Sequence, residues 1–311
     1  MLSPVPYAVA LGCFIFTAIT VPLYLCISVT IFLSRKLRNL PFFVLNAVLG
    51  VVDVMAITVI YVFQRLPLNG FFPFIDEPSG LSLAFAHTCN SGFTFVKWWQ
   101  NFIILLVAFS RFTTLAIPLE HPRYWNKSAA RTYAIIGFFF SLSLSTLPLV
   151  DGPVKYINYN TSIPSIKSMP TACITVDLEG EPSVFWVANV IITSGLTILT
   201  GLVSAVLNGY AVVVLFRECS RWMASVSGST INPRHCAEMK LTLIAAVNTI
   251  VLCLNGFVAA LILFGVESDW LNIVGYIVVD IVCGIGPYIM LLFSSEMRSE
   301  LYYRLCGWFK C

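Results

Sequence analysis

Charged residues are scarce in this sequence: Asp, Glu, Lys and Arg make up only 11% of its 311 residues, against about 25% in an ordinary soluble domain. So few charges cannot cover a surface in contact with water, which excludes most soluble enzymes and scaffold proteins. The formal net charge of +3 is too small to indicate a nucleic-acid partner. With three histidines and no cysteine–histidine spacing typical of a zinc site, we expect neither a metal nor a cofactor.

Long hydrophobic runs are what the sequence has instead, with 58% hydrophobic residues and a mean hydropathy of +0.87. A helix needs about 20 apolar residues to cross the hydrocarbon core of a bilayer. Seven segments approach or exceed that length, and none shows the two-residue alternation of a membrane β-strand. They are 7–33, 40–63, 89–117, 132–150, 184–216, 241–266 and 271–293. We therefore predict an all-α membrane protein in which residues 1–311 form a single bundle of seven transmembrane helices.

Lys and Arg residues lie mostly on one side of the predicted bundle. The loops after the first, third, fifth and last segments, with the adjoining helix ends, carry 14 of them, whereas the other loops carry Arg65, Lys155 and Lys167. Cytoplasmic loops are enriched in Lys and Arg. We therefore predict an extracellular amino terminus and a cytoplasmic carboxyl terminus.

A short amphipathic helix is predicted at about residues 295–309. Apolar side chains recur there at steps of four, four and three, a pattern typical of a helix that lies on a membrane surface. These side chains are Met297, Leu301, Leu305 and Trp308. Cys306 and Cys311 are placed where palmitoyl chains could anchor the helix; the alternative is that they are unmodified thiols.

Two of the ten cysteines, Cys89 and Cys173, fall on the predicted outer side, where oxidising conditions favour disulfides. We predict a bond between them, which would hold the long loop before the fifth helix over the third helix. The alternative is two free thiols. The same loop contains Asn160-Thr161-Ser162, an acceptor sequence for glycosylation at Asn160.

Three ionisable residues fall inside the predicted helices: Asp53, Lys97 and Asp280. Such a group costs at least about 2.5 kcal/mol at the bilayer centre, so it normally faces the bundle interior and has a partner. Counted from Cys89 and Leu271, Lys97 and Asp280 lie roughly 12 Å and roughly 14 Å below the outer helix ends. Their similar depth predicts a Lys97–Asp280 pair, which either lines a ligand pocket or has a structural role.

Two further polar residues complete the candidate site. Asn101 follows Lys97 by one helical turn and is a third candidate for the ligand pocket. Asp53 lies near the middle of the second helix, and we interpret it as a proton or cation site that is coupled to a conformational change.

Arg111 ends the third hydrophobic segment, and Pro118 follows it seven residues later. With seven helices and an external cysteine pair, this pattern resembles a G-protein-coupled receptor, which implies that Arg111 meets the carboxyl-terminal helix of a Gα subunit. The chain departs from the rhodopsin-like pattern at Ser110, where an acidic residue is usual, and at Gly286-Pro287-Tyr288, where the usual motif has an asparagine before the proline.

Four stretches are instead similar to the nematode serpentine chemoreceptors of the gamma-type superfamily, class V or class gamma. They are Arg38–Phe43, Arg65–Gly70, Arg111–Trp125 and Pro287–Ser295. The resemblance implies a receptor in the plasma membrane of a sensory neuron, in its cilium, that signals through a heterotrimeric G protein.

Other classes of membrane protein fit less well. A transporter of a small solute, the main alternative, would need two matching halves with broken helices. A retinal-linked rhodopsin would need a lysine in residues 271–294, which contain none. An intramembrane enzyme could use Asp53 and Asp280, but neither lies in a recognisable catalytic motif. We therefore predict a receptor that is not an enzyme, in which a small external molecule binds between the third, fifth, sixth and seventh helices.

Overall fold

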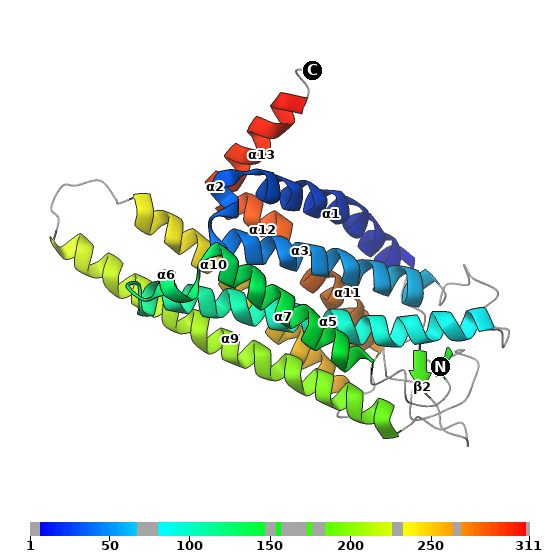
Figure 1. Ribbon diagram of the computed structural model, residues 1–311. Coiled ribbons are helices and arrows are strands. Elements are labelled where there is room, and N and C mark those ends of the chain that lie inside the picture. Colours follow the sequence, from blue (N-terminus) through cyan, green and yellow to red (C-terminus); the bar gives the residue numbers. More distant parts are fainter. Residues whose placement is uncertain are drawn as a thin grey trace.

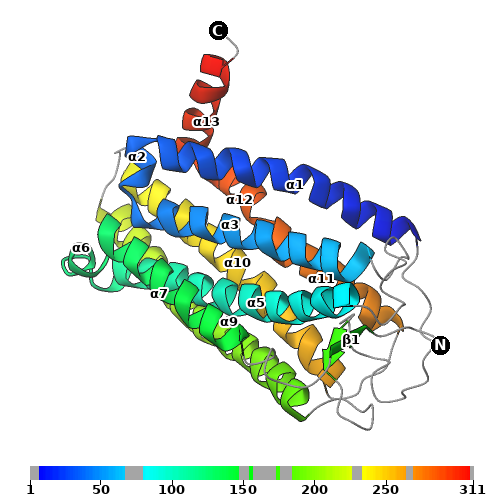
Figure 2. The same ribbon diagram turned by 45° about the vertical axis from the view of Figure 1, so that its right-hand side comes forward.

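The structure is a computed structural model that describes residues 7–66, 80–146, 154–156, 173–175, 184–225, 233–263 and 269–308. Its long helices run along a common direction and form an elongated bundle (Figures 1 and 2). These helices are α1 (Tyr7–Leu33), α3 (Pro41–Ile60), α5 (Gly80–Ala116), α7 (Lys127–Ser145), α9 (Val184–Ser225), α10 (Pro233–Leu263), α11 (Asp269–Gly284) and α12 (Gly286–Phe293).

Six further elements of the described chain lie between these helices or follow the last of them. They are α2 (Arg35–Arg38), the π-helix η1 (Tyr61–Arg65), α6 (His121–Tyr124), α13 (Ser295–Trp308) and the strands β1 (Val154–Tyr156) and β2 (Cys173–Thr175). The two strands pair antiparallel, with Val154 opposite Thr175, and both contact α5.

Five of the described helices, α1, α3, α5, α9 and α10, are long and apolar enough to cross a membrane. The pair α11 and α12 forms a sixth candidate span, although the two helices are bent by 49°. Helix α7 occupies the position of the predicted fourth span, but it does not reach the same length and hydropathy over its described residues. The bundle is therefore that of a helical membrane protein with several spans.

Apolar side chains face outward as well as inward, as expected when lipid is the solvent. Helices α3 and α5 contribute most to the interior, where Phe43 and Ile103 are buried. On the outer surface, Ile19 of α1 and Val206 of α9 are exposed. The most buried helices are thus those that carry Asp53 and Lys97.

The predicted seventh helix is broken at Ile285, between α11 and α12. Pro287 lies in the first turn of α12, where it has no backbone N–H to donate and its ring conflicts with the carbonyl of Cys283. Glycines flank the break, and a Cβ added at Gly284 would overlap the ring of Phe16 in α1. The lack of a side chain at Gly284 therefore allows α1 to approach this helix closely.

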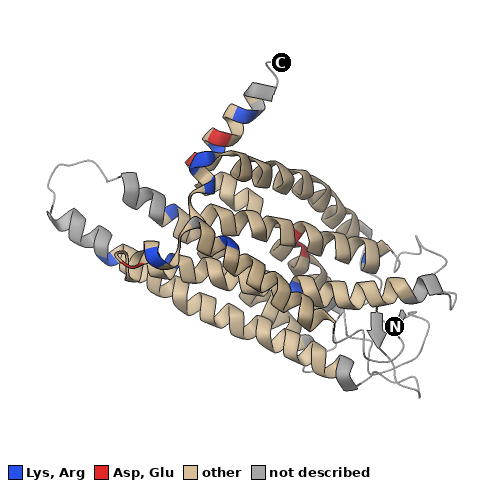
Figure 3. Ribbon diagram, in the orientation of Figure 1, with Lys and Arg blue, Asp and Glu red and all other residues tan. Residues whose placement is uncertain are grey.

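Lys and Arg gather at the end of the bundle where α2 and α6 lie and where α13 begins (Figure 3). Helix α13 leaves the bundle there and runs across its long axis (Figures 1 and 2). Met297 of α13 is buried against the core, whereas Tyr302 and Tyr303 are exposed. A salt bridge of 3.2 Å between Lys36 and Glu296 links α2 to α13.

Candidate functional site

A π-turn at the end of α3 positions the first polar cluster. The backbone N–H of Leu66 bonds to the carbonyl of Tyr61, five residues earlier, so the helix continues past the predicted end at Phe63. This extra turn carries Arg65 into the bundle, where the side chain is only 5% exposed. Turns of this kind are frequent at functional sites.

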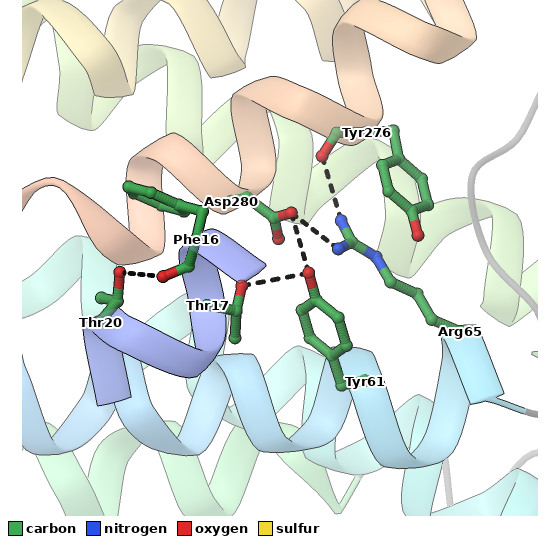
Figure 4. Close-up of polar contacts among 7 residues, drawn as sticks. All are labelled: Phe16, Thr17, Thr20, Tyr61, Arg65, Tyr276 and Asp280. Atoms are coloured by element: carbon green, nitrogen blue, oxygen red, sulfur yellow. Dashed lines mark hydrogen bonds and ion pairs between the residues drawn. The ribbon is translucent and has the colours of Figure 1, made fainter. Parts of the chain in front are cut away.

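The Arg65 cluster joins α1, η1 and α11 (Figure 4). The guanidinium of Arg65 donates to Asp280 over 2.7 Å and to the carbonyl of Tyr276 over 3.0 Å. The hydroxyl of Tyr61 donates to the same Asp280 oxygen over 3.1 Å and accepts from Thr17 over 3.0 Å. The guanidinium also lies 3.6 Å from the centroid of the Tyr276 ring. We define the cluster as Thr17, Tyr61, Arg65, Tyr276 and Asp280.

The predicted Lys97–Asp280 pair is wrong, because Asp280 is paired with Arg65. Helix α5 begins at Gly80 rather than at residue 89, which places Lys97 roughly 25 Å from the start of its helix, against roughly 17 Å for Asp280 in α11. The guanidinium of arginine holds its donors in a rigid planar fork, which suits simultaneous hydrogen bonds to a carboxylate and a carbonyl.

A second cluster surrounds Asp53 in the middle of the bundle. The hydroxyl of Tyr24 donates to one carboxylate oxygen over 2.5 Å, and the amide of Gln100 donates to the other over 2.6 Å. The same amide lies 3.7 Å from the sulfur of Cys283. The Asp53 cluster, defined as Tyr24, Asp53, Gln100 and Cys283, thus ties together α1, α3, α5 and α11.

A cavity of about 10 Å³ borders Asp53 and is also lined by Asn248 and Gly286. This is about the smallest cavity that can hold one water molecule, so it is too small for an organic ligand.

The other two predicted pocket residues, Lys97 and Asn101, both lie on α5. Asn101 donates to Thr197 of α9 over 2.9 Å. Lys97 is 6% exposed, and its ammonium has no hydrogen-bond partner among the described residues. The ring of Phe93 lies near this ammonium, with its centroid 5.7 Å away.

Arg111 lies near the other end of α5 and is also buried. Its guanidinium carbon is 4.5 Å from the centroid of the Phe42 ring. His121 of α6 packs nearby, with its Nδ1 3.0 Å from the hydroxyl of Thr113 and its ring stacked on Trp125. Burial and the positive charge of Arg111 lower the pKa of His121 to about 4, so its imidazole is neutral at neutral pH.

The predicted modification sites are only partly within the described structure. Cys89 is a free, buried cysteine, so the predicted bond to Cys173 is absent, although β2, which begins at Cys173, contacts α5. Cys306 lies in α13 as a free thiol. Asn160 and Cys311 lie outside the described residues.

Sequence reasoning missed Arg65, Tyr61, Tyr24 and Gln100. One signal was available: a tyrosine precedes Arg65 by four residues, and another precedes Asp280 by four residues. Residues four apart share one face of a helix, so this spacing puts a ring beside each member of the ion pair. Tyr24 and Gln100 have no comparable signal.

The family model of the Srg family chemoreceptors matches residues 10–301 of the chain. The match covers the chain from within α1 to within α13. None of the curated proteins matches the chain.

Proposed function

The chain belongs to the Srg family of chemoreceptors, a nematode serpentine receptor family, and we propose that it is a G-protein-coupled receptor with seven transmembrane helices. In this proposal α7 is the fourth span, and the pair of α11 and α12 is the seventh. A small external molecule binds in the outer half of the bundle, and the receptor then activates a heterotrimeric G protein.

The Asp53 cluster carries this proposal. A single carboxylate accepts hydrogen bonds from α1 and α5 while it belongs to α3, and the break between α11 and α12 lies beside it. A ligand that favours one arrangement of these helices shifts the population toward that arrangement. Asp53 is then the switch residue that couples the outer half of the bundle to the inner half.

Arg111 is the proposed contact for a Gα subunit at the cytoplasmic end. It is buried in this structure, so coupling requires the inner ends of the helices to separate and expose it. The basic residues around α2 and α6 support this orientation, which places the amino terminus outside and the receptor in the plasma membrane of a sensory cilium. Glycosylation at Asn160 and palmitoylation of Cys306 and Cys311 belong to the same proposal.

Transport of a small solute is the alternative and has less support. Transporters built from two repeats carry broken helices at matching positions in both halves. Among the described helices, α11 with α12 is the one pair that forms a bent span.

Expression with a promiscuous Gα subunit tests the proposed function. Cells that carry the receptor are screened with volatile and water-soluble compounds, and a compound that drives Gα activation only in these cells is expected. Arg111→Ala should abolish the response at equal surface expression. Arg123→Ala is the matched control, because Arg123 lies at the same end of the bundle but is exposed. A full response from Arg111→Ala would show that the assigned coupling role is wrong.

Epitope tags test the orientation independently. A tag at Met1 should be labelled in intact cells, and a tag at Cys311 should be labelled only after permeabilisation. Labelling of both tags in intact cells would contradict an odd number of spans.

A further inference from the structure

Two interhelical hydrogen bonds define a row of polar contacts between α5 and α9. The amide of Asn189 donates to Thr94 over 3.2 Å, and the amide of Asn101 donates to Thr197 over 2.9 Å. The two helices run parallel, so the two bonds lie at successive depths along the interface between α5 and α9. Each depth is called a level of the row. The α5–α9 row consists of Thr94, Lys97 and Asn101 on α5 and of Asn189, Thr193 and Thr197 on α9.

The middle level of this row is incomplete. Lys97 lies between Thr94 and Asn101 at helical spacing, and Thr193 lies midway between Asn189 and Thr197. The ammonium of Lys97 and the hydroxyl of Thr193 are both buried, and neither has a hydrogen-bond partner among the described residues. Buried polar atoms are nearly always paired, so two such atoms at one level indicate a group that the receptor takes up from outside.

The receptor's own buried carboxylates do not fill this position. Asp53 accepts from Tyr24 and Gln100 through its two oxygens, and Asp280 accepts from Arg65 and Tyr61. These are the two buried acidic residues in the part of the chain that the structure describes. Within the described residues the Lys97 ammonium therefore has no hydrogen-bond acceptor, and a ligand can supply one.

We propose that the ammonium of Lys97 and the hydroxyl of Thr193 bind the carboxylate of the external ligand, a small organic acid with an apolar body. A carboxylate has two acceptor oxygens, one for each donor, and its single negative charge matches the single charge of lysine. A phosphate monoester carries about −1.5 to −2 charges at neutral pH and would leave buried charge without compensation. The ring of Phe93 beside the ammonium suits an apolar ligand body. This inference rests on the proposed receptor function and names its class of ligand.

Binding to the purified full-length receptor tests the inference without a G protein. The probes are phenylacetate, cinnamate and hexanoate, each compared with its primary amide, and the measurement is the unfolding temperature, which rises when a ligand binds the folded state. At least one carboxylate should raise this temperature, and its amide should not. A rise caused by the amides alone, or no rise with any of the three carboxylates, would overturn the inference.

Variants identify the site. Lys97→Met should weaken binding of the active carboxylate by about tenfold to about a hundredfold, the range of one charge-assisted hydrogen bond, and Lys97→Arg should restore part of it. Thr193→Val should weaken binding by about twofold to tenfold. Thr88→Val is the matched control, because Thr88 is an exposed threonine of α5 and the change should leave binding as it is.

Unchanged binding in Lys97→Met would refute the site. If Lys97→Met does not fold, Thr193→Val and Lys97→Arg still test whether these residues bind the carboxylate. Unchanged binding in Thr193→Val would then refute the site. Because no arm of this experiment uses a G protein, a receptor that binds carboxylates but activates no Gα subunit would refute the proposed function alone. A receptor that responds only to neutral compounds would refute the carboxylate site alone.

Discussion

Arg65 and Lys97 are both cations buried in the bundle, but their surroundings differ. Arg65 donates to a carboxylate and a carbonyl and lies against two tyrosine rings, whereas the Lys97 ammonium has no hydrogen-bond partner among the described residues. A charge that is paired on every side holds helices together. A buried charge with open donors costs stability, and proteins retain such groups where function requires them. The contrast separates a structural pair from the proposed carboxylate site.

The largest effect is expected from removing Arg65. Arg65→Met leaves Asp280 buried without its cation, which typically costs about 3–5 kcal/mol. The measurement is the free energy of unfolding in detergent, with surface expression as a second measure. Lys36→Met is the control: its salt bridge to Glu296 is exposed, and the loss should stay below about 1 kcal/mol. Equal losses in the two variants would remove the structural role assigned to Arg65.

Removing one donor from Asp53 should have a smaller effect. Tyr24→Phe keeps the ring but deletes the 2.5 Å hydrogen bond to Asp53, and the expected loss is about 1.5–3 kcal/mol because the acceptor is charged. Unfolding of the purified receptor measures it, and Tyr302→Phe on exposed α13 should change little. A Tyr24→Phe receptor as stable as the unmodified one would mean that Gln100 alone satisfies the carboxylate.

Lys97→Met should change stability in the opposite direction. The variant removes a buried ammonium that lacks a hydrogen-bond partner within the described structure, so the ligand-free receptor should become more stable by about 1–2 kcal/mol. The same unfolding measurement compares it with Arg65→Met. A loss of stability would mean that Lys97 has a structural role like that of Arg65, and the contrast between the two cations would disappear.

An effect that is absent at neutral pH concerns a third buried cation, Arg111, through its neighbour His121. The pKa of His121 is lowered to about 4 in the folded chain by burial and by Arg111, whereas an unfolded histidine has a pKa of about 6.5. The unfolded state therefore binds the proton more readily as the pH falls, so folded stability is complete above pH 6.5 and declines between about pH 6.5 and about pH 4.

His121→Gln tests this dependence, because glutamine does not titrate. Unfolding temperatures at neutral pH and at about pH 5 should differ less in the variant than in the unmodified receptor. Equal declines in both would show that other groups cause the pH dependence.

Hydropathy was sufficient to predict most of the helices. Helix α1 has the predicted bounds of residues 7 and 33, and the match to the Srg family confirms the resemblance to nematode serpentine chemoreceptors. These features depend on the composition of long segments, which a single sequence displays directly. The break at Ile285 was not predicted, although Pro287 gives its local cause.

The partner of Asp280 could not be derived in the same way. A pairing depends on the depth of each side chain, and depth depends on where helices begin and end. The α5 helix extends beyond its most apolar residues to Gly80, and the turn at Tyr61–Arg65 gains a residue without any change in hydropathy. Errors of a few residues in the predicted helix ends were enough to make Lys97, rather than Arg65, the predicted partner of Asp280.

The π-helix η1 has a consequence for how insertions and deletions are tolerated in this receptor. Each residue of an α-helix turns the chain by roughly 100°, so loss of one residue between Tyr61 and Arg65 would swing the guanidinium away from α11 and toward lipid. Relatives that differ in length at this point should therefore also differ at the position of Asp280. In such relatives, a one-residue deletion in η1 should occur together with the loss of the carboxylate at the position of Asp280.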